Sequence, residues 1–163
     1  MSIFAKSWSE GVAIKIQQIK DQFLEYDFQE QSYYGFDSNK KKVYFIAKTD
    51  QEPENPLLLI HELAHAELGH LDYQSDLELV LIEIKAWDKA RAICQDIEVE
   101  YDPRLRDACI QTYIDWYKLR GTCPNCDTLC INKHQKYNCY QCLTSWEVSS
   151  SLHPDPRKYN LVF

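Results

Sequence analysis

Two histidines and a glutamate occur at a spacing that suits metal-dependent hydrolysis. His61, Glu62 and His65 form the pattern HExxH. In a helix, residues four apart lie on one face, so both imidazoles can bind one metal ion. The glutamate beside the first histidine can then take a proton from a water that the metal activates. A catalytic zinc needs three protein ligands, so the pattern predicts a further ligand elsewhere in the chain.

Glu83 is the third ligand that the sequence favours. At about 100° per residue, it falls on the apolar face of a helix expected over residues 75–96, beside Leu79 and Trp87. A carboxylate on that face is costly unless it is paired or bound to a metal. A salt bridge to a buried base, or a position at the helix edge that reaches solvent, would explain it without a metal. Three residues closer to the motif are the other ligand candidates: His70, Asp72 and Asp76.

Four cysteines predict a second, structural metal site. They form two CxxC pairs, Cys123 with Cys126 and Cys139 with Cys142. Four thiolates at this spacing are typical of a tetrahedral zinc, and the pattern indicates a zinc ribbon in which Cys130 is a spare thiol. So short a module has too little core to fold alone, so metal binding would supply its folding energy. Disulfide pairing is the alternative, and a reducing compartment disfavours it.

The overall composition indicates an acidic globular protein. The chain has 163 residues, 45% of them hydrophobic, and a formal net charge of −7. This charge argues against a general nucleic-acid or anionic-membrane partner and leaves a local nucleic-acid contact through the cysteine module open. The N-terminal residues lack the apolar run of a signal peptide, and no stretch reaches the roughly 20 apolar residues of a membrane span. We therefore expect a cytoplasmic protein.

Hydrophobic periodicity and capping signals predict a mainly helical α+β fold with a small antiparallel sheet. An N-terminal amphipathic helix is expected from a stripe spaced by three and four residues, formed by Trp8, Val12, Ile16, Ile19, Phe23 and Tyr26. Strands are expected over residues 31–36 and 43–47, joined as a hairpin. Three helices follow. Asn55 caps the first, which carries HExxH; a capping box of Ser75 and Glu78 begins the second, over 75–96; and the third ends at Gly121.

The composition changes at Gly121, where the chain becomes rich in cysteine and loses its helical period. We therefore expect three parts: a metallopeptidase-like domain over residues 1–120, a zinc ribbon over 121–148, and an irregular tail over 149–163. The strand at 43–47 could pair with an extended substrate.

The sequence HELAH, followed by a helix that carries Glu83 and Ala86 in an E-x-x-A pattern, resembles the gluzincin metallopeptidases. It is most similar to the ImmA/IrrE-type metallopeptidases, small intracellular proteins with E-x-E-A-x-x-x-A after HExxH. The resemblance covers roughly residues 7–120, and Lys85 stands where that family usually has a second acid. It implies a zincin-type fold, with Glu83 as the third zinc ligand beside the two histidines and Glu62 as the catalytic base.

These observations predict a zinc-dependent intracellular endopeptidase that acts on a protein substrate. A SprT-like protease is an alternative, because that family also joins an HExxH helix to a C-terminal zinc ribbon and acts on proteins attached to DNA. Its third histidine could only be His70 here. A non-catalytic metal-binding regulatory or interaction protein is another alternative. Three tyrosines are candidates for stabilising an oxyanion: Tyr73, Tyr113 and Tyr117.

Overall fold

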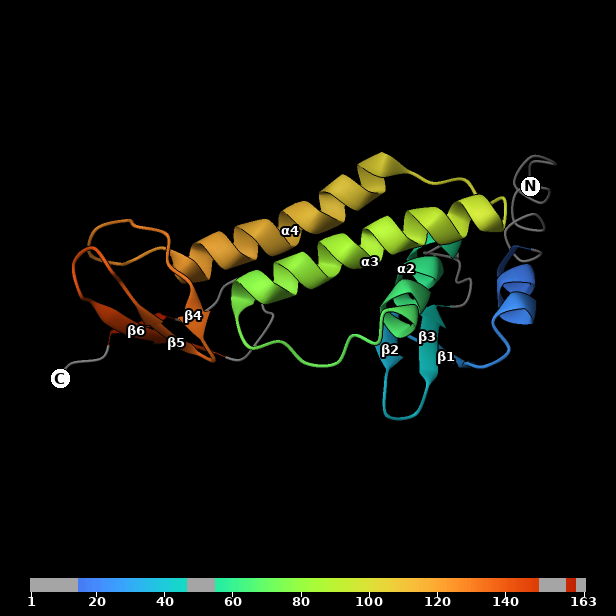
Figure 1. Cartoon of the computed structure of the whole chain (residues 1–163), viewed down its shortest axis with the longest axis horizontal. Helices are drawn as coiled ribbons and strands as arrows, with labels where there is room; N and C mark the ends of the chain where they lie inside the picture. The colour runs from blue at the N-terminus through green and yellow to red at the C-terminus, as the bar shows by residue number, and fades with distance from the viewer. Residues whose placement is uncertain (1–14, 47–54, 150–157, 161–163) are drawn as a thin grey trace. The chain divides into compact units, whose positions relative to one another are not determined.

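The computed structural model describes residues 15–46, 55–149 and 158–160 (Figure 1). A helix over residues 15–22 comes first, and it buries Ile16 and Ile19 of the predicted stripe, whereas Trp8 and Val12 lie outside the described residues. The other elements are β1 (Asp27–Gln31), β2 (Gly35–Asp37), β3 (Lys42–Ile46), α2 (Pro56–Glu67), α3 (Asp76–Asp96), α4 (Pro103–Gly121), β4 (Asn132–Lys133), β5 (Lys136–Asn138), β6 (Ser145–Val148) and β7 (Lys158–Asn160). The predicted α+β class is confirmed.

The chain forms two compact units, and α3 takes part in both. The first unit contains residues 1–71 and 85–102, and the second contains residues 72–84 and 103–163. Because α3 is one continuous helix, the boundary between the units falls inside it, between Ile84 and Lys85. The cysteine module therefore shares a unit with α4 and the first turns of α3, whereas its independence as a domain beginning at Gly121 stays a prediction.

The first unit contains a three-stranded sheet in the order β1-β3-β2 (Figure 1). β2 and β3 form the predicted antiparallel hairpin. β1 runs parallel to β3, so this sheet is mixed rather than antiparallel. Residues 31–36 are not one strand, because the chain bends between Gln31 and Gly35. β1 exposes most of its residues, so its sequence lacks the apolar alternation from which a strand is recognised.

β3 is the central strand of this sheet, with β1 on one side and β2 on the other. The expectation that residues 43–47 could pair with an extended substrate is therefore wrong for β3, whose two edges already have neighbours. Ala47 lies outside the described residues. In the part of the chain that the structure describes, β1 and β2 are the edge strands of the sheet.

α2 and α3 begin at the capping residues that the sequence predicts. The Asn55 side chain accepts a hydrogen bond from the Leu57 amide at 3.0 Å, with proline in the first turn of α2. The Ser75 hydroxyl accepts from the Glu78 amide at 3.1 Å, and the Glu78 carboxylate accepts from the Gln74 amide at 2.7 Å. Each cap satisfies an amide that has no partner within its own helix.

The end of α2 is a Schellman motif. The helix stops at Glu67, and Gly69 follows with φ of 62°, a left-handed conformation that glycine adopts without strain. The Gly69 amide then donates to the Ala66 carbonyl at 3.1 Å, and the His70 amide donates to the His65 carbonyl at 3.1 Å. This pair of bonds closes the helix and reverses the chain direction at a defined point.

α3 buries one face along its length. The buried residues on this face are Leu79, Val80, Glu83, Ala86, Trp87, Ala90, Ile93 and Cys94. Glu78, Lys85 and Asp88 are exposed, so the predicted amphipathic arrangement is confirmed. Among the helices that the structure describes, none combines the length and apolar character needed to cross a membrane.

A buried ion pair joins the start of α3 to the end of α4 in the second unit. Asp76 and Arg120 are each 2% exposed, and Arg120 Nε donates to the Asp76 carboxylate at 2.5 Å. That carboxylate also accepts from the Tyr137 hydroxyl and the Asn132 side-chain amide. Burial and the bond to Asp76 raise the pKa of Tyr137, so its hydroxyl stays protonated and donates. The Asp76 charge thus has several partners, which offset the cost of burying it.

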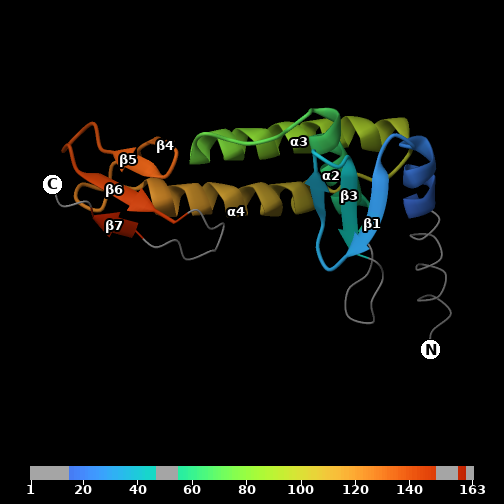
Figure 2. The same cartoon turned by 90° about the horizontal axis from the view of Figure 1, so that it is seen from below.

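The second unit contains an antiparallel sheet in the order β4-β5-β6-β7. Tyr137 on β5 stacks on Trp146 on β6, with ring centroids 5.1 Å apart. Of the expected irregular tail over 149–163, the described residues Lys158–Asn160 are a strand instead, because they pair with β6 as β7 (Figure 2). Three residues carry too little periodicity to predict a strand, so the available edge of β6 decides this pairing.

The buried ion pair gives the first prediction. Arg120→Ala should lower the free energy of unfolding by roughly 3–5 kcal/mol, because it leaves the Asp76 charge buried without its main partner. Arg106→Ala in the same helix is the matched control, since its pair with Asp107 is partly exposed and such pairs contribute at most about 1 kcal/mol. Denaturant unfolding followed by tryptophan fluorescence measures both, and equal destabilisation would contradict the prediction.

Candidate metal centres

α2 brings the two histidines of HExxH to one point. His61 and His65 lie one turn apart, and their Nε2 atoms are 3.2 Å apart. Two nitrogens bound at about 2.0–2.1 Å to one tetrahedral zinc are separated by roughly 3.3 Å. The observed spacing therefore fits two ligands of a single metal ion.

Trp87 on α3 fixes the orientation of His61. Their rings stack with centroids 4.3 Å apart and planes inclined by 24°, and Trp87 is fully buried. Stacking occupies a face of the imidazole and leaves its nitrogen-bearing edge for other contacts. Glu83 lies four residues before Trp87 on the same unbroken helix. Residues four apart share a helix face, so the face that meets His61 also carries Glu83.

Glu83 joins the two histidines in a group that could hold a metal ion. One ligand atom from each of His61, His65 and Glu83 lies within 4.8 Å of the others. Glu83 is 5% exposed. Burial, with a further contribution from the Glu83 charge, raises the pKa of Cys109. Two imidazoles and a carboxylate form a three-ligand set that suits zinc and leaves one position for water.

The structure places the other ligand candidates differently. His70 Nδ1 lies 3.0 Å from His65 Nδ1, the ring nitrogen that does not face the first histidine of the motif. Asp76 belongs to the buried ion pair, and Asp72 lines a pocket in the second unit. The group that the structure brings together therefore contains Glu83 and none of these three residues.

The three tyrosines proposed for an oxyanion site belong to the second unit. The Tyr117 hydroxyl donates to the Cys130 carbonyl at 3.1 Å, so it has a structural role. Tyr113 packs beside the buried side chains of Leu79 and Trp116, and Tyr73 lines the same pocket as Asp72. An oxyanion role for Tyr73 or Tyr113 stays a prediction.

The four predicted cysteines converge in the second unit. The Sγ atoms of Cys123 and Cys142 are 3.6 Å apart, and those of Cys126 and Cys139 are 3.5 Å apart. All four lie within 4.8 Å of one another and form no disulfide. Thiolates bound at about 2.3 Å to one tetrahedral zinc are separated by roughly 3.8 Å. The cluster therefore fits a single metal ion with four sulfur ligands.

The two CxxC turns repeat one backbone pattern. In each turn the amide of the first cysteine donates to a threonine carbonyl, at 2.9 Å from Cys123 to Thr128 and 2.8 Å from Cys139 to Thr144. The same threonine hydroxyl lies 3.3 or 3.2 Å from the sulfur of the second cysteine. The sequence reasoning missed these threonines, although the repeated pattern CxxCxT would have revealed them.

Hydrogen bonds favour the thiolate form of one cysteine in this cluster, Cys142. The Thr144 hydroxyl and the Asn125 side chain lower the pKa of Cys142, whereas burial raises the pKa of Cys123. The four thiols therefore do not ionise alike without a metal. A bound cation would draw the remaining thiols into the thiolate form and release their protons.

Cys130 is buried but is not a member of the cluster. Its amide donates to the Gly121 carbonyl at 2.9 Å, which ties the cysteine module to the end of α4. A Cβ on Gly121 would lie 2.9 Å from the Cys130 carbonyl oxygen. Glycine is therefore required where α4 ends, because the two backbones approach so closely there.

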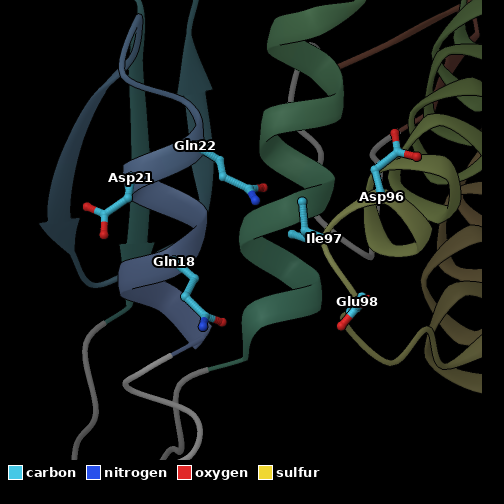
Figure 3. Close-up of a pocket in the computed structure, with 6 residues that line it drawn as sticks. All are labelled: Gln18, Asp21, Gln22, Asp96, Ile97 and Glu98. Atoms are coloured by element: carbon cyan, nitrogen blue, oxygen red, sulfur yellow. The ribbon is translucent and has the colours of Figure 1, made fainter.

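A separate pocket of about 470 Å³ in the first unit is lined by Gln18, Asp21, Gln22, Asp96, Ile97 and Glu98. Figure 3 shows that the three carboxylates point in different directions. Carboxylates bind a cation when their oxygens converge on it. The pocket is therefore not a candidate metal site.

Comparisons of the chain with protein-family models, with curated proteins and with solved structures find no match. The resemblance to ImmA/IrrE-type peptidases therefore stays a prediction from HELAH and from the helix that carries Glu83 and Ala86. The geometry of the two groups that could hold a metal ion is the basis for inferring a function.

The histidine group gives the second prediction. Glu83→Ala should release the metal from His61 and His65 and spare the metal of the cysteine cluster, because it removes one of three ligands and the only negative charge among them. The loss of affinity should exceed the roughly 10–100-fold typical of removing an outer partner. Asp96→Ala, an exposed acid on the same helix, is the control. Metal content by mass spectrometry measures the effect, and an unchanged content in Glu83→Ala would contradict it.

The cysteine cluster gives the third prediction. Cys126→Ser should lose the cluster metal and make the second unit sensitive to protease, because a closed four-thiolate site supplies folding energy. Cys130→Ala should keep the metal, since Cys130 lies outside the cluster. Zinc content and limited proteolysis measure both. A Cys126–Cys139 disulfide in protein isolated under thiol protection would contradict the metal assignment.

Proposed function

We propose that this protein is a zinc-dependent endopeptidase of the gluzincin type, in which His61, His65 and Glu83 hold the catalytic zinc. The observation that carries the proposal is the grouping of these three ligand atoms within 4.8 Å, with Glu62 next to the first histidine. When bound, zinc would polarise the substrate carbonyl and lower the pKa of a water. The donor set suits zinc because it combines two imidazoles with one carboxylate.

Glu62 performs the proton transfers in this proposal. It follows His61 on α2 and is partly buried. Its carboxylate takes a proton from the attacking water while the water oxygen bonds to the carbonyl carbon of the substrate. It then passes that proton to the amide nitrogen as the C–N bond breaks. The products are a carboxylic acid and an amine, and no further reactant is needed.

The cysteine cluster has a structural role in the proposal, as a zinc ribbon. A metal with four sulfur ligands has no position left for water or substrate. Its closed shell would instead stabilise the second unit, where the surrounding core consists of Tyr137, Trp146 and Val148 with the cysteines themselves. Two zinc ions per chain, one catalytic and one structural, are therefore expected.

The SprT-like alternative requires a histidine as the third ligand. His70 is the residue available for that role, and its contact with His65 Nδ1 does not favour it. The remaining alternative is a protein that binds metal without hydrolysing a substrate. The same metal site would serve both functions, so a measurement of turnover must distinguish them.

Glu62→Gln gives the fourth prediction. This substitution should retain both metals and the fold but lower the hydrolysis of a disordered protein substrate by roughly 100-fold or more, because it removes a base and no ligand. Glu67→Gln on the same helix is the matched control and should keep full activity. Equal activity of Glu62→Gln and the unaltered protein would refute the mechanism. Metal-loaded protein that cleaves no peptide bond would favour the non-catalytic alternative.

A further inference from the structure

Three histidines form a continuous chain of contacts at the end of α2. His65 Nε2 lies 3.2 Å from His61 Nε2, and His65 Nδ1 lies 3.0 Å from His70 Nδ1. The His65 and His70 rings meet at 69°, with centroids 5.1 Å apart. Each ring nitrogen of His65 therefore has a neighbouring imidazole: Nε2 faces His61 and Nδ1 faces His70.

The tautomer of His65 determines which of its ring nitrogens can bind a metal. A neutral imidazole carries its proton on one nitrogen and a lone pair on the other. If Nε2 is to bind the ion that it shares with His61, the proton must lie on Nδ1. That proton then needs an acceptor, and His70 Nδ1 is at the right distance to be one.

The backbone at the end of α2 holds His70 in this position. Gly69 adopts φ of 62°, and the His70 amide donates to the His65 carbonyl at 3.1 Å. The residue whose amide donates the second bond of the Schellman motif is thus the residue whose ring reaches back to His65. His70 and His65 are joined through backbone and side chain together, which limits the movement of both rings.

We infer that His70 is a positioning residue for the metal site: it accepts the Nδ1 proton of His65 and so leaves His65 Nε2 free to bind the ion. This inference rests on the proposed function, because it assigns His70 a role beside the same metal. His70 orients a ligand and does not itself bind the ion. Partners of this kind usually contribute roughly 10–100-fold to metal affinity.

Titration with Co²⁺ tests the inference and gives the fifth prediction. Zinc is left in the cysteine cluster, the histidine group is emptied with a chelator, and Co²⁺ uptake is followed by visible absorption. His70→Ala should weaken Co²⁺ binding by roughly 10–100-fold and alter the absorption spectrum, because the His65 ring loses its fixed orientation. His70→Asn should restore most of the affinity, since its side-chain oxygen can accept the same proton.

Two controls make the outcome specific. His134→Asn removes an exposed imidazole at a residue with φ of 57°, a conformation that asparagine tolerates, and it should leave Co²⁺ binding unchanged. His61→Ala removes a ligand and should abolish uptake at this site. If the unaltered protein takes up no more Co²⁺ than His61→Ala does, the proposed function fails. If it binds Co²⁺ and His70→Ala binds equally well, the inference alone fails.

Discussion

The stacking of Trp87 on His61 is the contact on which the histidine site depends. It brings the first histidine of HExxH against α3 with ring centroids 4.3 Å apart. The indole Nε1 is buried and has no hydrogen-bond partner among the described residues, a cost that the ring contact must offset. With Trp87 fixed, the pitch of one helix determines which residues share its face. Glu83, one turn earlier, follows from that constraint.

The core of the second unit depends on hydrogen bonds to the buried Asp76 carboxylate. Asp76 accepts hydrogen bonds from Arg120, Tyr137 and Asn132, which come from α4, β5 and β4. These bonds hold the start of α3 to elements much later in the chain. The cysteine cluster adds a second constraint of the same kind, because each of its sulfurs must meet the other three. Neither arrangement tolerates the loss of one partner, since the others would stay buried without compensation.

The sequence predicted the parts of the fold that local chemistry controls. Asn55 caps α2, Ser75 caps α3 and Gly121 ends α4, because each signal acts within a few residues of the helix end. The parallel pairing of β1 with β3, and β7 as a strand, were not predicted. A parallel pairing joins strands through intervening chain and leaves no turn signal, and an exposed edge strand has little apolar alternation.

Residue types and their spacing identified the residues that could bind metal. HExxH and the two CxxC pairs reveal their candidate ligands because the spacing within one turn already sets the geometry. Glu83 becomes a candidate because a carboxylate in an apolar stripe is costly. The folded chain determines which contacts each candidate makes. It put Asp76 into an ion pair with Arg120, and it turned His70 back onto His65 through the left-handed Gly69. Both contacts depend on how distant or reversed segments of the chain meet, and the type and spacing of the individual residues do not specify such meetings.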